Sequence, residues 1–215
     1  MRIVIAGGHG QIALRLTRQA SAAHEVVGIV RNPAHRADVE AAGGVAELLD
    51  LETADASDLV GLLAGAGAAV FAAGAGPGSG SARKQTVDHG AAALLGEAAV
   101  RAGVRRQVQI SSMGIERAGS PGVDETFAAY LRAKGAAEED LRGRDLDWTV
   151  LRPGRLTDVA GSGLVQLADA VSYGEVSRDD VAAVVLALLE QGTGVRRTLE
   201  LVGGDTPVAD AVAAL

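Results

Sequence analysis

Tyr130 and Lys134 are the residues whose types and spacing most directly suggest chemistry. They lie four residues apart in a stretch of helical period, so both side chains project from one helix face. An ammonium about 4 Å from a phenol, at an effective dielectric of about 20, contributes about 4 kcal/mol, or nearly three pKa units. A tyrosine with an ordinary pKa of about 10 would then exchange a proton near neutral pH. The alternative is a tyrosine packed on a sheet beside a solvated lysine.

A second candidate site lies at the start of the chain. The apolar run Arg2 to Ala6 leads into Gly7-Gly8-His9-Gly10, and an amphipathic stretch follows. Gly7 permits a tight turn and Gly10 permits close approach of a pyrophosphate, which would meet the free N–H groups and positive dipole end of the new helix. The alternative is a turn with no ligand. The expected cofactor contacts at this turn are Gly7, His9, Gly10, Gln11 and Ile12.

Arg31 predicts which dinucleotide is bound. It follows the second apolar run, about 20 residues beyond the glycines, where NAD-binding domains usually carry an acid for the ribose 2′-hydroxyl. An arginine there can instead hold a 2′-phosphate. We therefore expect NADP(H) to be favoured over NAD(H), unless Arg31 is only a solvated side chain.

Three further segments are expected at the cofactor by their position. Asp50 and Leu51 end the third apolar run, where an adenine edge is commonly contacted. Ala72, Ala73 and Gly74 end the fourth run and leave room for a dinucleotide. The glycine-rich stretch from Gly74 to Ser81 follows, where an α/β sheet places ligand-contacting loops, although it could also be a flexible linker.

Elements that alternate along the chain must position these residues. Short apolar runs alternate with segments of helical period, which predicts an α/β fold with a doubly wound parallel sheet of Rossmann type and a small C-terminal elaboration. We expect one domain over residues 1–215, with substrate-region elements after about residue 155. The expected strands are Arg2 to Ala6, Glu25 to Val30, Val45 to Leu49, Ala68 to Ala73, Arg106 to Ser111 and Asp147 to Leu151. The expected helices are Gln11 to Ala22, Pro33 to Ala42, Ser57 to Ala64, Arg83 to Ala102, Asp124 to Arg142 and Arg178 to Gln191.

Composition excludes several classes of function. The formal net charge is −7 with no cluster of basic residues, so nucleic acid is not an expected partner. Cysteine is absent, which removes disulfides and thiolate chemistry. His24, His35 and His89 have no companions at metal-ligand spacing, so no metal is expected. The start of the chain resembles no export signal, and no apolar run reaches the roughly 20 residues of a membrane span, so a cytoplasmic location without membrane contact is expected.

The combined motifs resemble the short-chain dehydrogenase/reductase superfamily, specifically its atypical NAD(P)H-binding branch, which includes flavin and biliverdin reductases and redox-sensing relatives. The resemblance covers nearly the whole chain. It rests on GGHGQIA, VRNP, ISSM, YLRAK, LDWTVLRPG and SRDDVA.

The resemblance implies roles for particular residues. Tyr130 would be the general acid/base, and Lys134 would hold the nicotinamide ribose. Ser112 would polarise a substrate carbonyl, whereas its neighbour Ser111 would lie at the strand end beside the cofactor. Pro153, in the segment Arg152 to Arg155, would lie on the nicotinamide side.

Two functions remain open at this point. The first is an NADPH-dependent oxidoreductase that reduces a small-molecule carbonyl, quinone or flavin-like acceptor, which the Tyr130 and Lys134 pair favours. The second is a non-catalytic NADP(H)-binding redox sensor that acts through a partner protein. Sugar-nucleotide epimerase chemistry is less favoured, because the C-terminal part is small. The substrate and the oligomeric state do not follow from the sequence.

Overall fold

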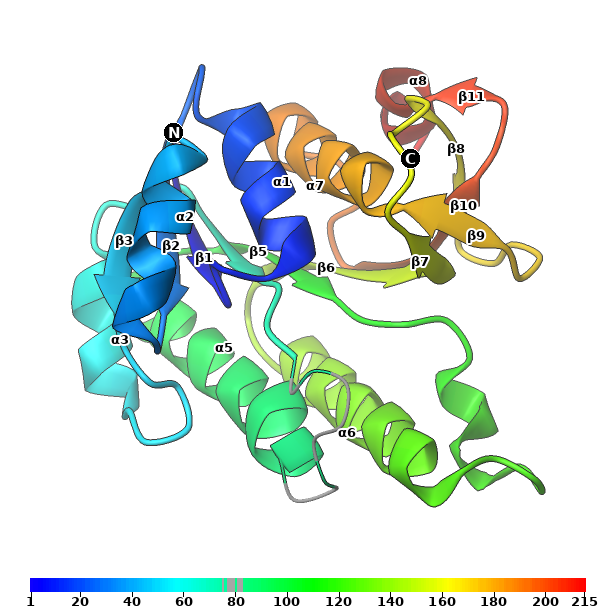
Figure 1. The fold of residues 1–215 in the computed structure, drawn as a ribbon, viewed down its shortest axis with the longest axis horizontal. Coiled ribbons are helices and arrows are strands. Elements are labelled where there is room, and N and C mark those ends of the chain that lie inside the picture. The colour runs from blue at the N-terminus through cyan, green and yellow to red at the C-terminus, as the bar shows by residue number, and fades with distance from the viewer. Residues whose placement is uncertain (75, 77–79, 81–82) are drawn as a thin grey trace.

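The fold is built on a nine-stranded, mostly parallel sheet. The computed structural model describes residues 1–74, 76, 80 and 83–215. The strand order is β11-β8-β10-β6-β5-β4-β1-β2-β3 (Figure 1). Seven of these strands run parallel: β1 (Arg2–Ala6), β2 (Glu25–Val30), β3 (Val45–Leu48), β4 (Ala68–Phe71), β5 (Arg106–Ile110), β6 (Asp147–Pro153) and β10 (Arg197–Gly203). At one end of the sheet, β8 (Leu164–Ala168) pairs antiparallel with β10, and the edge strand β11 (Thr206–Pro207) pairs antiparallel with β8.

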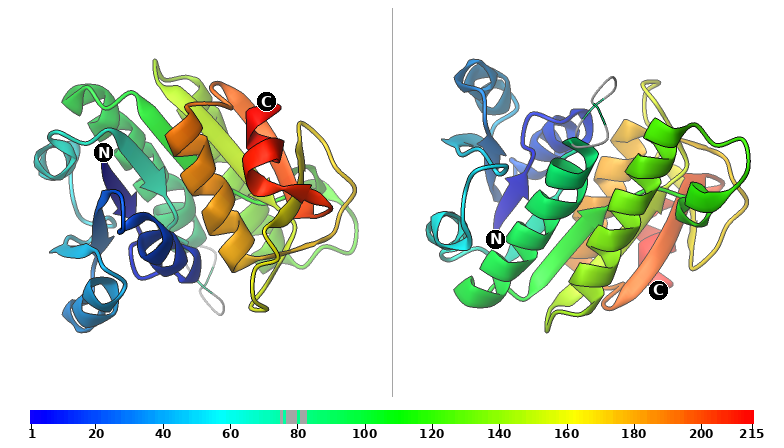
Figure 2. Two further views of the ribbon diagram at one scale, coloured as in Figure 1. Left: turned by 90° about the horizontal axis from the view of Figure 1, so that it is seen from above. Right: turned by 90° about the horizontal axis from the view of Figure 1, so that it is seen from below.

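Helices cover both faces of this sheet, as Figure 2 shows from above and below. One face carries α1 (Gln11–Ala20), α7 (Arg178–Gln191) and α8 (Val208–Ala213), and α2 (Arg36–Ala41) packs beside α1. The other face carries α3 (Ala56–Leu63), α5 (Ala91–Ala102) and α6 (Glu125–Arg142). The remaining helical turns are η1 (Pro33–His35), the π-helical η2 (Lys84–Gly90) and η3 (Ile115–Gly119). A separate two-stranded sheet joins β7 (Arg155–Thr157) to β9 (Glu175–Ser177).

Buried parallel strands explain why the apolar runs are continuous. In β1, Ile3 and Ile5 pack against the α1 and α7 layer, whereas Val4 and Ala6 pack against the α3 and α5 layer. Because both faces of the strand are covered, every side chain after Arg2 must be apolar. The Rossmann-type α/β fold predicted from the alternation is confirmed.

Local signals place most element boundaries well. The predicted limits of β1, β2 and α7 are confirmed. Ser177 accepts a hydrogen bond from the backbone N–H of Asp180 at the start of α7, and Gly103 ends α5 in a left-handed conformation, with φ of 72°. These ends were predictable because capping depends on neighbouring residues alone.

Other boundaries differ from the predictions. The predicted helix Arg83 to Ala102 is wrong as one α-helix, because its first turns are the π-helical η2. The predicted helix Pro33 to Ala42 divides into η1 and α2. The predicted strand ends at Leu49, Ala73 and Ser111 are too late, since β3, β4 and β5 stop at Leu48, Phe71 and Ile110.

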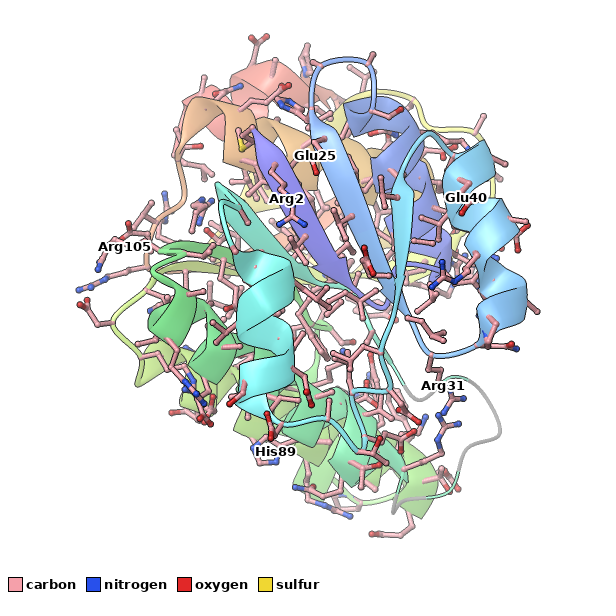
Figure 3. The ribbon with its side chains drawn as sticks, turned by 90° about the vertical axis from the view of Figure 1, so that its left-hand side faces the viewer. Arg2, Glu25, Arg31, Glu40, His89 and Arg105 are labelled. Carbon is pink, nitrogen blue, oxygen red and sulfur yellow. The ribbon has the colours of Figure 1, made fainter. Side chains whose placement is uncertain are left out.

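The C-terminal strands were not predicted. Strand β10 pairs in parallel with β6, and this pairing carries β6 two residues past its predicted end, to Pro153. The amino-terminal ends of the strands, marked by Arg2 and Glu25 in Figure 3, lie opposite the end where Arg31 leaves β2. The carboxyl ends of the parallel strands therefore share one edge, where ligands bind in open α/β sheets.

Candidate functional site: a dinucleotide groove with a tyrosine at one end

The turn between β1 and α1 consists of the four residues Gly7 to Gly10. Gly7 has φ of +84°, and a Cβ there would lie 2.6 Å from the Cα of Ala73. A Cβ on Gly8 would lie 2.5 Å from the Cα of Gly28 in β2. Gly10 is the N-cap residue of α1 and makes no side-chain hydrogen bond to the first turn of the helix. These glycines bring the backbone close to both neighbouring strands and leave a helix start suited to an anion.

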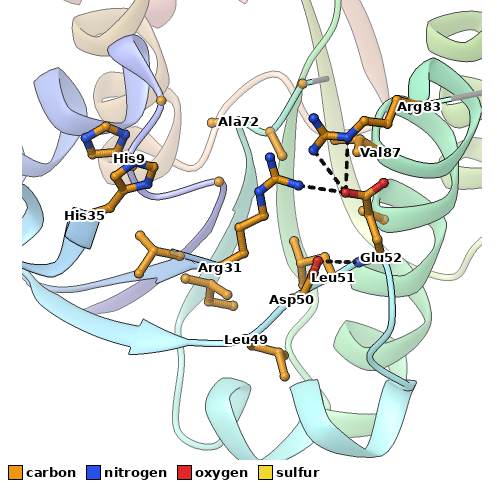
Figure 4. Close-up of a pocket in the computed structure, with 17 residues that line it drawn as sticks. His9, Arg31, His35, Leu49, Asp50, Leu51, Glu52, Ala72, Arg83 and Val87 are labelled. Atoms are coloured by element: carbon orange, nitrogen blue, oxygen red, sulfur yellow. Dashed lines mark hydrogen bonds and ion pairs between the residues drawn. The ribbon is translucent and has the colours of Figure 1, made fainter. Parts of the chain in front are cut away.

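A cavity of about 230 Å³ begins at this turn and follows the carboxyl ends of β2, β3 and β4 (Figure 4). Nine residues expected to contact the cofactor line it: Gly7, His9, Gly10, Arg31, Asp50, Leu51, Ala72, Ala73 and Gly74. The structure therefore brings residues from four separate segments to one cavity. Most of the glycine-rich stretch after Gly74 lies outside the described residues.

The turn after β3 and a pair of stacked histidines contribute further side chains to this cavity. The side chain of Asp50 accepts the backbone N–H of Glu52 at 3.0 Å, which fixes the bend after β3. His9 is stacked on His35, with ring centroids 3.6 Å apart, and its Nε2 lies 2.7 Å from Asp38 Oδ2. His35 and Glu52 also line the cavity, and neither was predicted from the sequence to contact the cofactor. The adjacency of Glu52 to the predicted pair Asp50 and Leu51 was the available signal.

Glu52 is held by two arginines. Arg31 Nη1 donates to Glu52 Oε2 at 2.9 Å, and Arg83 donates to the same oxygen from Nη2 at 3.0 Å and Nε at 3.3 Å. Thr86 donates its hydroxyl to Oε1 at 2.7 Å. The hydrogen bonds from Arg83 and then Thr86 hold the pKa of Glu52 below its ordinary value. Glu52 is therefore a carboxylate at neutral pH.

A second cavity, of about 540 Å³, adjoins the first. The two share Ala72, Ala73 and Gly74 as a common wall, so one extended ligand can pass from one to the other. The second cavity contains Tyr130, Lys134, Ser111 and Ile12 from the predicted site, together with Asp88, which was not predicted. The other lining residues are Gly76, Lys84, Ile110, Asp124, Thr126, Phe127 and Leu156.

Lys134 is buried in an ion pair. Its Nζ lies 3.3 Å from Asp88 Oδ1 and donates to the backbone carbonyl of Ile110 at 3.2 Å. The same Nζ is 5.8 Å from the ring centroid of Tyr130, and Lys84 Nζ lies 5.4 Å from that centroid. Two ammonium groups thus approach the ring of Tyr130, one of them already paired with Asp88.

Ser111 and Ser112 have different surroundings. Ser111 Oγ donates to Oε1 of the buried Glu138 at 2.6 Å. Ser112 Oγ donates to the backbone carbonyl of Met113 at 3.1 Å. Among the described residues that line the second cavity, Ser111 is present and Ser112 is not.

Glu138 is a buried carboxylate held by two guanidiniums. Arg152 donates to both of its oxygens, at 2.9 and 2.6 Å, and Arg142 Nη2 donates at 2.7 Å. The hydrogen bond to Glu138 raises the pKa of Arg152 above its ordinary value. This network joins the end of β5 to α6 and β6.

Three predicted site residues line neither cavity in the part of the chain that the structure describes. Gln11 is exposed, and its side-chain oxygen accepts from Arg15 at 2.8 Å. Pro153 ends β6, where its carbonyl accepts the N–H of Met113 at 3.0 Å. Ser112 is the third.

The groove fits a dinucleotide on structural grounds. A Cβ on Gly7 or Gly8 would clash with neighbouring backbone, so this part of the turn is shaped by bare backbone, as close approach of a pyrophosphate requires. Arg31 and Arg83 line the first cavity together with acidic and apolar side chains, and Tyr130 and Lys134 of α6 line the second. Among the residues that the structure describes, no group of three His, Asp or Glu side chains could hold a metal ion. Within the same residues, no helix has the length and hydropathy needed to cross a membrane.

Comparison with known proteins agrees with this geometry. The NAD(P)H-binding family model matches residues 7–192. The uncharacterized sugar epimerase YhfK of Bacillus subtilis is 34% identical over 214 residues, covering 99% of both chains. A solved structure from Bacillus halodurans, provisionally named an NAD-dependent epimerase/dehydratase, superposes with a TM-score of 0.91 at 29% identity and covers 100% of both chains.

A more distant match shares the fold. The anaerobilin reductase ChuY of Escherichia coli O157:H7 superposes with a TM-score of 0.80 at 24% identity, over 95% of this chain and 98% of that one. The expected resemblance to atypical short-chain dehydrogenases/reductases is confirmed. The chain belongs to the NAD(P)H-binding family.

Proposed function

We propose that this protein is an NADP(H)-dependent oxidoreductase that reduces a small carbonyl, quinone or flavin-like acceptor. The observation that carries the proposal is the shared wall of Ala72, Ala73 and Gly74. A dinucleotide whose adenosine half lies beside Arg31 and whose pyrophosphate lies at the glycine turn would extend its nicotinamide half toward Tyr130. Bound NADPH supplies the hydride there.

Tyr130 is the proposed proton donor. Tyr130 lines the second cavity, and a phenolic hydroxyl can protonate an acceptor oxygen as a general acid. Lys134 is held by its ion pair with Asp88 and its hydrogen bond to the Ile110 carbonyl, and its ammonium has further N–H donors for a ribose hydroxyl. The Ser111 hydroxyl donates its hydrogen bond to Glu138, so its oxygen can only accept one from the ligand. Carbonyl polarisation is thereby assigned to Tyr130 rather than to either serine.

Arg31 supports NADP(H) over NAD(H). Its guanidinium reaches the first cavity from the end of β2, the position at which an acid would favour an unsubstituted ribose. A charged hydrogen bond worth about 1.5–3 kcal/mol corresponds to roughly a 10-fold to 150-fold preference. The comparison that tests it is calorimetric titration with NADPH and NADH.

The function itself is tested by an NADPH oxidation screen. The purified protein is mixed with NADPH and a panel of aldehydes, ketones, quinones and flavins, and absorbance at the nicotinamide band is followed. Turnover of any class supports the proposal. Tight NADPH binding without turnover across the panel would contradict it and favour a redox sensor.

A second candidate is suggested by the names of two relatives. YhfK is named a sugar epimerase, and the Bacillus halodurans protein is named for epimerase/dehydratase activity. An epimerase leaves the oxidation state of its cofactor unchanged over a full cycle. Conversion of a sugar substrate without net NADPH consumption would therefore support this candidate against the first.

A further inference from the structure

Arg83 faces Arg31 across the adenosine half of the groove. Arg31 comes from the end of β2, whereas Arg83 immediately precedes η2, 52 positions later in the chain. Both guanidiniums converge on one oxygen of Glu52, at 2.9 and 3.0 Å, as the dashed lines in Figure 4 show. Both residues line the first cavity. Of the two, only Arg31 was predicted from the sequence.

Each arginine keeps donors beyond those that Glu52 uses. A guanidinium carries five N–H donors. Among the contacts of the described residues, Arg31 gives Glu52 only Nη1, and Arg83 gives it Nε and Nη2. The Nε and Nη2 of Arg31 and the Nη1 of Arg83 are therefore available to a ligand. The two side chains are 51% and 37% exposed, so a ligand can reach them without unfolding the rim.

Glu52 arranges this pair before a ligand arrives. The hydroxyl of Thr86 donates to its carboxylate, and its backbone N–H donates to Asp50. The carboxylate is therefore held in one place, where both guanidiniums bind it. Ordering the two long side chains in advance removes much of the conformational entropy that binding would otherwise cost. An arrangement of two guanidiniums with free edges suits a phosphate monoester, which offers three acceptor oxygens.

We propose that Arg83 and Arg31 together form the binding site for the 2′-phosphate of NADP(H), with Glu52 as the positioning residue. The assignment rests on the proposed use of NADP(H), because Arg31 occupies the ribose position at the end of β2. Arg83 is thus a specificity-determining residue supplied from the opposite wall of the groove.

The test uses adenosine 2′,5′-bisphosphate and 5′-AMP, which differ only by the 2′-phosphate. Calorimetry on the full chain gives the ratio of their dissociation constants. We expect at least about a 10-fold preference for the bisphosphate in the parent, and an approximately 10-fold smaller ratio in both Arg83→Met and Arg31→Met, as loss of a charged hydrogen bond predicts. Affinity for 5′-AMP should stay nearly constant. Arg83→Lys should retain part of the preference.

Arg101→Met is the matched control. Arg101 is a similarly exposed arginine on α5 that contacts Glu97 and Ser57 away from the cavity, so its ratio should equal that of the parent. If Arg83→Met keeps the parental ratio while Arg31→Met loses it, the assignment of Arg83 is overturned and the NADP(H) preference stands. A parental ratio near one overturns both.

Discussion

The hydroxyl of Ser111 donates to the buried carboxylate of Glu138 at 2.6 Å. A hydroxyl has one proton, so this bond leaves the Ser111 oxygen able only to accept from a ligand in the cavity. The carboxylate is held in turn by Arg142 and Arg152. The buried carboxylate of Glu138 therefore sets the direction of the hydrogen bond made by Ser111, the serine that lines the second cavity among the described residues.

Ser111→Ala should have a small effect on acceptor reduction. Because the serine proton is already used, the substitution removes a hydrogen-bond acceptor and leaves the proton donor in place. We expect a loss in kcat/KM of at most about 10-fold, the range of an ordinary hydrogen bond, and a loss of unfolding free energy of about 1.5–3 kcal/mol from the bond to Glu138. Steady-state kinetics and urea denaturation measure the two effects. A loss in kcat/KM as large as that of Tyr130→Phe would contradict the assignment of Ser111 as a hydrogen-bond acceptor toward the ligand.

Tyr130→Phe should bind NADPH nearly as well as the parent but lose most reductase activity. The substitution removes the proposed proton donor and little packing volume, and general acid catalysis contributes about 100-fold to 10,000-fold. Single-turnover kinetics with the best acceptor from the screen measures the loss. Tyr173→Phe, at an exposed tyrosine, is the control and should retain full activity. Full turnover by Tyr130→Phe would remove the tyrosine from the mechanism.

Glu138→Gln should destabilise the protein strongly. The substitution neutralises a fully buried carboxylate between Arg142 and Arg152, and breaking such a buried ion pair costs about 3–5 kcal/mol. For a chain of this size the Tm should fall by roughly 6–20 °C. Glu139→Gln is the control, because Glu139 is exposed and pairs with the same Arg142. Equal Tm values for the two variants would show that the buried network contributes little.

Gly8→Ala and Gly10→Ala should separate folding from binding. The added Cβ at Gly8 would lie 2.5 Å from the backbone of Gly28, so β1 and β2 must shift and both stability and NADPH affinity should fall. At Gly10 the nearest atoms, Gly7 O and Ala72 O, would be 3.1 and 3.3 Å away and φ is −60°, so the fold should accommodate alanine. Thermal denaturation paired with NADPH titration should then show weaker binding with nearly parental stability for Gly10→Ala. Unchanged affinity in that variant would place the pyrophosphate elsewhere.

Acidification should remove the contribution of Glu52 to stability. Hydrogen bonds from Arg83 and Thr86 hold the pKa of Glu52 below its ordinary value of about 4.5 in the folded state. A lowered carboxyl pKa stabilises the folded state fully above the unfolded-state pKa, and the contribution is lost as pH falls through the folded-state pKa. The difference in unfolding free energy between the parent and Glu52→Gln should therefore be constant above about pH 5.5 and shrink at lower pH. Denaturant titrations at pH 7 and pH 3 measure it, and a pH-independent difference would exclude this linkage.

Much of the fold was predictable from the sequence because its signals are local. The apolar run Arg2 to Ala6, the turn Gly7 to Gly10 and the amphipathic stretch after it each depend on neighbouring residues, and together they predict a β-α unit. The strands β8 and β10 were not predicted, because polar or exposed residues interrupt their apolar residues and neither forms the continuous apolar run of a fully buried strand. The π-helical turns of η2 were also missed, since residues 84–90 have an ordinary helical composition.

The sequence by itself determined the α/β class, the glycine turn and the candidate residues at the strand ends. Parallel strands bring their carboxyl ends to one edge, so residues that follow strands were expected to meet there. Only the tertiary structure decided their partners: Arg83 with Glu52, Asp88 with Lys134, and Glu138 with Ser111. Each pair joins residues 27 or more positions apart, and no local spacing specifies which carboxylate a crossover connection will place beside which cation or hydroxyl.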